Sequence, residues 1–154
     1  MGNKKVKIFN NLKNLLIPDK SITLPLPVAQ GRVKEKWIDY NGHMNMAYYV
    51  KCFEESTDYL LEVLNLGYEY AIKRKKGVFV IKCEINYKKE IKIDEYFNID
   101  LKSIECKGKK LIVDLIMTND DGVEVADYHI INLNVNLNNK KSISFDKDIL
   151  NQLS

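Results

Sequence analysis

The feature that most constrains the fold is one long helical pattern that precedes four extended ones. Between residues 46 and 64, apolar side chains recur at the three- and four-residue spacing of one helix face. The stripe consists of Met46, Tyr49, Val50, Phe53, Thr57, Leu60, Leu61 and Leu64. Asn45 is a typical N-cap residue and Gly67 is typical of the position just beyond a helix, so these two residues predict its limits.

After Gly77 the pattern changes to that of strands. Four segments are rich in Ile, Val, Tyr and Phe, namely residues 78–87, 96–105, 109–118 and 123–137. Turn residues at 106–109 and 119–122 predict that the last three strands are joined as antiparallel hairpins. A first strand is expected from Val28 to Lys36. This order predicts an α+β fold, with an antiparallel five-stranded sheet packed on one long central helix.

Such a sheet leaves an edge strand without a partner. Pairing the edges of two chains across a two-fold axis would cover it, so we expect a homodimer, or a homotetramer built from that dimer. The expected domain spans residues 28–154.

Residues 1–27 form an N-terminal extension and linker. Ile8, Leu12, Leu15 and Leu16 share a helix face, which predicts a short amphipathic helix that ends at Pro18. The prolines of residues 24–27 lack a backbone N–H, so this stretch is expected to be an extended surface linker and not a central strand. A short helix is expected at residues 146–153.

Composition narrows the classes of function. The net charge of +3 is too small to indicate a nucleic-acid partner, and the chain has no recognisable nucleic-acid-binding motif. The three cysteines are scattered, which is typical of free thiols in a reducing compartment. The apolar runs are too short to cross a bilayer, and the two distant histidines give no metal-ligand spacing. We therefore expect a cytoplasmic protein with no membrane association, no metal and no cofactor.

The segment just before the long helix contains candidate catalytic residues. Asp39, Asn41, Gly42 and His43 lie within a few residues of the expected helix start. A helix N-terminus offers unpaired N–H groups and a partial positive charge, which can stabilise a developing oxyanion. A carboxylate beside it can act as a general base on water or attack a carbonyl directly.

The same segment resembles the active-site segment of hotdog-fold thioesterases. It reads Asp39-Tyr40-Asn41-Gly42-His43-Met44-Asn45, followed by Ala47-Tyr48-Tyr49. The Asp-x-Asn-x-His-x-Asn spacing is similar to that of acyl-ACP thioesterases, and Asp-x-x-Gly resembles the 4-hydroxybenzoyl-CoA thioesterase family. The wider string, with Thr57-Asp58, is most similar to bacterial betainyl-CoA thioesterase relatives. The resemblance implies a hotdog fold, a dimer, and a thioester site at the subunit boundary.

The resemblance also implies roles for individual residues. Asp39 matches the catalytic carboxylate, and Asn41 and His43 match a polar catalytic pair. Gly42 matches the residue whose N–H binds the thioester carbonyl. Substrate contacts are implied for Gly42, Asn45, Tyr49, Glu84 and Tyr87, with Asn45 acting first as a helix cap. The chain departs from the betainyl-type pattern at residues 126–129, where it reads Ala-Asp-Tyr-His instead of Ala-Thr-x-Glu.

The expected function is hydrolysis of an acyl-CoA or acyl-ACP thioester to a free acid and a thiol. Two alternatives remain. One is a hydratase or dehydratase on the same fold, whose usual pattern inserts a proline and places the histidine one residue later. The other is a non-catalytic module that binds acyl-CoA. The basic run at residues 73–76 is either a solvated surface or a contact for the phosphates of coenzyme A.

Overall fold

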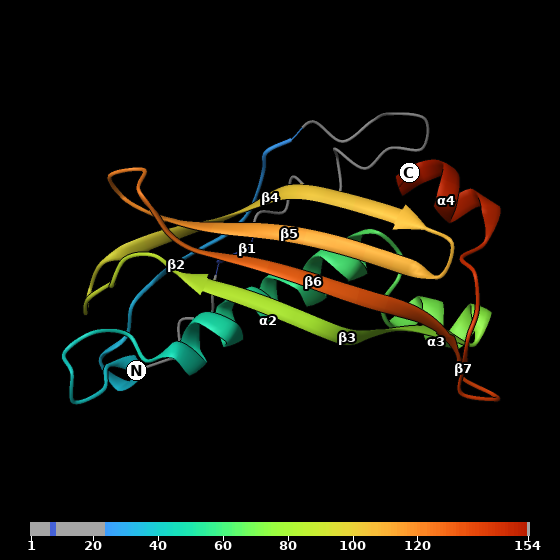
Figure 1. Ribbon diagram of the computed structural model, residues 1–154, viewed down its shortest axis with the longest axis horizontal. Coiled ribbons are helices and arrows are strands. Elements are labelled where there is room, and N and C mark those ends of the chain that lie inside the picture. Colours follow the sequence, from blue (N-terminus) through green and yellow to red (C-terminus); the bar gives the residue numbers. More distant parts are fainter. Residues whose placement is uncertain (1–6, 9–23, 154) are drawn as a thin grey trace.

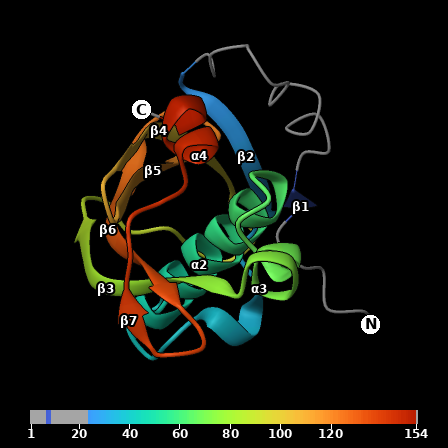
Figure 2. The ribbon, with the colours of Figure 1, turned by 90° about the vertical axis from the view of Figure 1, so that its right-hand side faces the viewer.

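The computed structural model describes residues 7–8 and 24–153, in which a curved antiparallel sheet wraps around one long helix (Figure 1, Figure 2). The helix is α2 (Met46–Val63). The sheet has five long strands: β2 (Leu26–Arg32), β3 (Lys76–Tyr87), β4 (Tyr96–Lys107), β5 (Lys110–Asn119) and β6 (Glu124–Asn136). Short strands β1 (Lys7–Ile8) and β7 (Lys141–Ser142) extend it. The order is β1-β2-β4-β5-β6-β3, with β7 also paired to β6, which confirms the predicted α+β architecture.

The core lies between α2 and the inner face of the sheet. Phe53 of α2 stacks on Tyr128 of β6, with ring centroids 5.0 Å apart. Two polar side chains are also buried on the helix, and each donates its hydrogen bond to a backbone carbonyl of the preceding turn. The Ser56 hydroxyl donates to the Cys52 carbonyl at 2.8 Å, and the Thr57 hydroxyl donates to the Phe53 carbonyl at 2.9 Å. The buried face of α2 includes Tyr49, Phe53, Thr57 and Leu60 of the predicted stripe. Met46, which was also predicted for the stripe, is 62% exposed.

The predicted limits of α2 agree with the structure to within one residue, but the helix is terminated at Asn65 and not at Gly67. The Asn45 side chain accepts a hydrogen bond from the Ala47 N–H at 3.0 Å, as an N-cap does. The helix ends at Val63, and Asn65 takes the left-handed conformation (φ 60°). The N–H groups of Asn65 and Leu66 bond back to the carbonyls of Glu62 and Leu61. This is a Schellman motif with asparagine where glycine is commoner.

Gly67 instead begins a helix that the sequence did not indicate, α3 (Tyr68–Arg74). A Cβ at Gly67 would lie 2.0 Å from Oε1 of Glu62, so the glycine makes room for that carboxylate.

The first strand was predicted wrongly at both ends. It begins at Leu26 and ends at Arg32, and a 3-10 helix, η1 (Glu35–Trp37), follows. The linker prediction therefore fails for Leu26 and Pro27, which lie opposite β4. A register shift between Pro27 and Ala29 accommodates the missing N–H of the proline. The described residues of β1 pair with Ala29 and Gln30, beyond the proline. In the predicted N-terminal amphipathic helix, residues 7–8 form β1 instead, and the remainder lies outside the described residues.

The hairpins and the last helix agree with prediction to within a few residues. Gly108 (φ 58°) and Gly122 (φ 75°) occupy the two turns, in a conformation that favours glycine. Helix α4 (Lys147–Leu153) is held by ion pairs from Arg74 to Asp146 (2.8 Å) and Asp148 (2.7 Å). Part of the basic run at residues 73–76 thus anchors the C-terminal helix.

Strand β3 closes the sheet on one side, and its outer edge is unpaired within the described residues. It carries exposed apolar side chains along its length. These are Phe79, Val80, Ile81 and Tyr87, with Ile81 54% exposed. A twelve-residue edge strand with four exposed large apolar side chains is unusual for a surface in contact with water.

Candidate functional site

The loop before α2 is a closed turn. The Gly42 N–H donates to the Asp39 carbonyl at 3.0 Å, and Gly42 has a φ of +85° that favours glycine. A β-bridge between Ile38 and Met44 closes the base of the loop. The Met44 N–H also donates to the Ile91 carbonyl at 2.9 Å, which ties the loop to the connection between β3 and β4. Backbone hydrogen bonds therefore fix Asp39 relative to the helix start.

The Asp39 carboxylate accepts hydrogen bonds from two donors of the same loop. Its Oδ1 accepts from the Asn41 N–H at 2.8 Å, and its Oδ2 accepts from Nδ2 of Asn45 at 3.4 Å. The Asn45 side chain uses its other end, Oδ1, to cap α2. One amide thus links the carboxylate to the first turn of the helix.

The backbone donor expected for the substrate is not free. Gly42 was expected to offer its N–H to a thioester carbonyl, but this N–H is used within the turn. The N–H of His43 has no acceptor among the described residues. The His43 ring lies close by, with Nδ1 3.4 Å from the Met44 carbonyl oxygen. His43 therefore places both an open N–H and a half-buried imidazole at the tip of α2.

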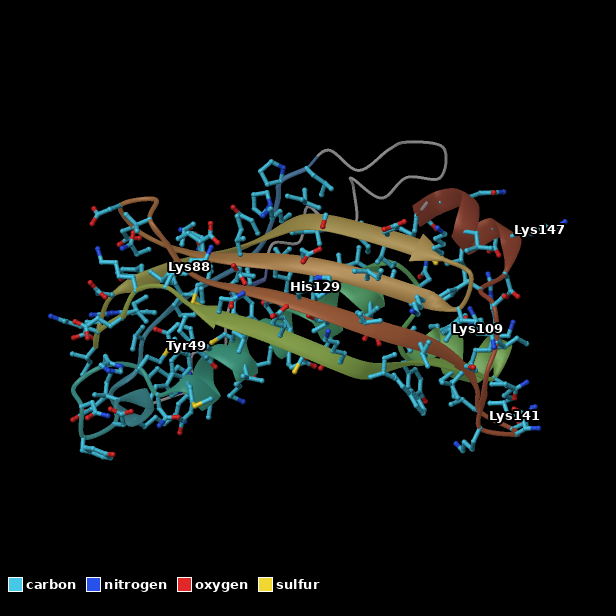
Figure 3. The ribbon with its side chains drawn as sticks, in the orientation of Figure 1. Tyr49, Lys88, Lys109, His129, Lys141 and Lys147 are labelled. Carbon is cyan, nitrogen blue, oxygen red and sulfur yellow. The ribbon has the colours of Figure 1, made fainter. Side chains whose placement is uncertain are left out.

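A pocket of about 250 Å³ opens beside this tip. Its walls are formed by His43, Met44, Met46, Tyr49, Tyr87, Lys88, Lys89 and Glu90. The rings of Tyr49 and Tyr87 meet edge to face, with centroids 5.1 Å apart. Burial raises the pKa of Tyr49 to about 12, so its phenol stays protonated at neutral pH. Figure 3 shows Tyr49 and Lys88 at the same end of the sheet.

Three of the eight residues predicted for the site line this pocket. His43, Tyr49 and Tyr87 line the pocket. The loop residues Asp39, Asn41, Gly42 and Asn45 lie directly beside it in sequence and do not themselves line it.

Glu84 lies apart from them. It is exposed on β3, opposite His129 of β6. The His129 ring is bonded to Asp114 of β5 at 2.6 Å on the outer face of the sheet, so Glu84 does not join the pocket within one subunit.

Two residues that line the pocket, Met44 and Met46, were not predicted for the site. Met44 and Met46 gave no signal beyond their place next to the motif. Lys88 faces the pocket and is also paired with Glu124 and with Asp127 (3.0 Å), which holds it in place.

A second, larger pocket of about 560 Å³ lies at the other end of α2. It is bounded by the last turns of α2, by α3 and by the start of β3. The lining residues are Asp58, Tyr59, Leu61, Glu62, Leu66, Gly67, Tyr68, Ala71, Gly77, Val78, Phe79 and Leu137. The two pockets therefore lie at opposite ends of the same strand, because the first is lined by the last residue of β3 and the second by its first residues.

Two absences apply to the described part of the chain. Residues 7–8 and 24–153 contain no cluster of three or more His, Cys, Asp or Glu side chains that could hold a metal ion. No helix in the same residues is long and apolar enough to cross a membrane.

Comparison with known proteins places the chain among thioesterases. The family model of the thioesterase-like superfamily matches residues 33–153. A betainyl-CoA thioesterase of Pseudomonas aeruginosa is 25% identical over 119 residues, which cover 77% of this chain and 75% of that protein. An L-carnitine dehydrogenase/betainyl-CoA thioesterase of Agrobacterium fabrum is 23% identical over 129 residues, or 84% of this chain. The matched part is only 26% of that relative's length.

Solved structures show the same fold. A hypothetical protein of Staphylococcus aureus, solved in complex with CoA, superposes with a TM-score of 0.74 at 20% identity, covering 80% of this chain and 78% of the other. The probable thioesterase YbaW of Escherichia coli superposes with a TM-score of 0.69 at 21% identity, covering 80% and 93%.

Proposed function

Because the chain belongs to the thioesterase-like superfamily, we propose that it hydrolyses an acyl-CoA thioester to a free acid and coenzyme A. The observation that carries this proposal is the Asp39 carboxylate, which Asn41 and Asn45 hold at the N-terminus of α2. It lies four residues before His43, which lines a pocket together with two tyrosines. The names of the similar proteins support CoA as the thiol carrier. An acyl-ACP substrate is the alternative for the same chemistry.

In the proposed reaction, Asp39 acts as a general base on water. The water oxygen attacks the thioester carbonyl carbon, and its proton passes to the carboxylate. The carbonyl oxygen becomes an oxyanion, which the open His43 N–H and the positive end of α2 stabilise. The C–S bond then breaks, and the proton moves from Asp39 to the departing sulfur. Asn41 and His43 orient these groups.

Direct attack by Asp39, with a transient anhydride, would use the same residues. In that route, water would hydrolyse the anhydride in a second step.

We propose that the active unit is a homodimer paired through β3. Its free edge and its exposed apolar residues favour antiparallel pairing with the β3 of a second copy. Antiparallel pairing sets the last residue of one β3 beside the first residues of the other. The pocket at Tyr87 would then adjoin the partner's larger pocket at residues 77–79, so that each reaction site lies at the subunit boundary.

The test is release of free thiol from a panel of acyl-CoA and acyl-ACP thioesters. Changing Asp39 to Asn removes the base but keeps the side chain's size, and we expect turnover to fall by about a hundredfold to ten-thousandfold. The matched control is Asp120→Asn, which changes an exposed turn carboxylate far from α2 in sequence. Both variants should melt at the wild-type temperature.

Three results would separate the alternatives. Wild-type turnover in a folded Asp39→Asn variant would exclude the mechanism. Hydration of an enoyl-CoA without thiol release would support a hydratase. Saturable binding of acyl-CoA without any turnover would support a binding module.

A further inference from the structure

A third pocket, at the turn between β4 and β5, is lined by lysine side chains that the chain leaves unpaired. Its volume is about 570 Å³, and its lining consists of Glu105, Lys107, Lys109, Lys110, Ile112 and Leu133. Within residues 7–8 and 24–153, Lys107 and Lys110 form no ion pair. The Lys109 ammonium group bonds to the Ser142 hydroxyl at 3.3 Å, which leaves its charge uncompensated.

The arrangement of these lysines is unfavourable in the absence of an anion. Lys107 and Lys110 stand directly opposite each other in the ladder between β4 and β5. Like charges in that position repel and destabilise a strand pair. Glu105 is the single acid of the lining, so the three ammonium groups outnumber it. A bound anion with several negative charges would neutralise this excess.

The rest of the lining fits a ligand that combines phosphate groups with a flat ring. Lysine binds phosphate as a point charge, and three lysines can serve more than one phosphate group. Ile112 and Leu133 point away from the core, since each alternates with buried neighbours along its strand. They form an apolar wall on which a base can lie, and Glu105 can accept a hydrogen bond from an amino group of that base. The pocket volume lies in the usual range of small-molecule sites.

Other basic residues that could meet phosphates are already neutralised by the chain. Three residues of the basic run at 73–76 form ion pairs with acids, namely Lys73, Arg74 and Lys76. At the reaction pocket, Lys88 is paired with two acids. Its neighbours in that lining, Lys89 and Glu90, carry opposite charges. The pocket at the turn between β4 and β5 is therefore better suited to a multiply charged anion.

We propose that this pocket is a binding site for the phosphate groups of a nucleotide. Lys107, Lys109 and Lys110 bind the phosphates, while Ile112 and Leu133 contact the base. The proposed substrate carries such a group, because coenzyme A ends in an ADP with a further phosphate on its ribose. A free nucleotide is the second source of the same chemistry. In either case the site takes no part in breaking the thioester bond.

The strand register favours a substrate held in the reaction site of the other subunit. Within one subunit, Figure 3 shows Lys109 at the opposite end of the sheet from Tyr49 and Lys88. Pairing through β3 would bring the last residue of the partner's β3 beside residues 77–79. From there a single cross-strand row leads across the sheet through Phe79, Leu133, Lys110 and Lys107.

The length of the substrate matches this path. Neighbouring strands lie about 4.8 Å apart, so three spacings put Lys110 about 15 Å from the partner's β3. The pantetheine arm of coenzyme A is about as long as four residues of extended chain, or roughly 14 Å. The substrate as the source of the nucleotide rests on the proposed hydrolysis and on pairing through β3, whereas the phosphate pocket lies within one chain.

The first test is binding of adenosine 3′,5′-bisphosphate to the full chain, measured by calorimetry. We expect the wild type to bind this probe, and the double variant Lys107→Gln/Lys110→Gln to bind it about 25-fold more weakly. This is about fivefold for each lysine, the worth of one charge pair about 4 Å apart in water. Because the double variant loses a like-charge repulsion, it should melt at or above the wild-type temperature.

The second test separates the two sources of the nucleotide. It compares kcat/KM for an acyl-CoA with kcat/KM for the same acyl group on pantetheine, which lacks the nucleotide. If the substrate supplies the nucleotide, the ratio of the two should fall by about 25-fold in the double variant. The matched control is Lys102→Gln, which removes an exposed lysine from β4 that does not line the pocket. It should keep the wild-type affinity for the probe and the wild-type ratio.

Each outcome bears on one proposal. Weaker probe binding by the double variant with an unchanged ratio would support the pocket, with a free nucleotide as its ligand. Failure of the wild type to bind the probe, or equal binding by the wild type and the double variant, would overturn the phosphate pocket. Hydrolysis of the acyl-pantetheine would still support the thioesterase proposal in that case. Absence of thiol release from both thioesters would instead count against hydrolysis and leave the binding result standing.

Discussion

Asn45 offers a test of the site that leaves the helix cap in place. Asp caps a helix about as well as Asn, so Asn45→Asp should keep the bond to the Ala47 N–H and the stability of α2. It replaces the Nδ2 donor, which lies 3.4 Å from Oδ2 of Asp39, with a second carboxylate. Two unit charges at that separation repel by about 1.2 kcal/mol even at the full dielectric of water. This energy disfavours ionisation of a carboxyl by about one pH unit.

The expected result is an upward shift of the acid limb of the kcat/KM profile by about one pH unit. The sign follows from the charge, because a neighbouring anion favours the protonated carboxyl and the active base then appears only at higher pH. The assay is thiol release from an acyl-CoA at low substrate concentration across the acidic and neutral range. Asn45→Ser is the matched control, since it caps α2 without adding a charge. A profile for Asn45→Asp that superimposes on the wild-type curve would refute the role of Asp39.

Two further predictions concern assembly and stability. Ile81→Lys places a charge on the exposed edge of β3 and should give a monomer by light scattering with little thioesterase activity, whereas a wild-type protein that is itself a monomer would contradict the pairing. Arg74→Ala should lower the free energy of unfolding by about 1 kcal/mol in a urea titration, because it releases α4. The basic neighbours lower the pKa values of Asp146 and Asp148, so this contribution is complete at neutral pH and is lost as the pH falls below about 4. A difference between wild type and variant that does not shrink in acid would count against the ion pairs.

The sequence predicted the main elements because their signals are local and repeated. Helix α2 and strands β4, β5 and β6 each bury residues at a regular spacing, and burial of that kind leaves a period that can be counted. Helix α3 was not predicted, because it has only seven residues and is held by residues that are far away in the sequence. Its Tyr70 hydroxyl donates to Oδ1 of Asn134, 2.6 Å away in β6. No local pattern encodes a contact between residues 64 positions apart.

In the candidate site, too, the residues that are close in sequence were predictable and those brought together by the fold were not. Asp39, Asn41 and Asn45 lie within seven consecutive residues, and the predicted helix start already brings them together. Tyr87 was expected from the family resemblance, and the fold brings it against Tyr49. The resemblance also implied Glu84, but the alternation of β3 does not bring Glu84 into that pocket. The larger pocket could not be predicted, since α2, α3 and β3 each supply only part of its wall.

The exposed edge of β3 also bears on how the protein is made. A newly folded single chain presents the free edge of a twelve-residue strand, with unpaired backbone groups at alternate residues and exposed apolar side chains. Such a strand pairs with whatever extended chain it meets first, including misfolded copies. The yield of the native protein should therefore depend on protein concentration in two opposing ways. Dilution slows the association of two folded chains, whereas a high concentration of unfolded chains draws folded chains into aggregates.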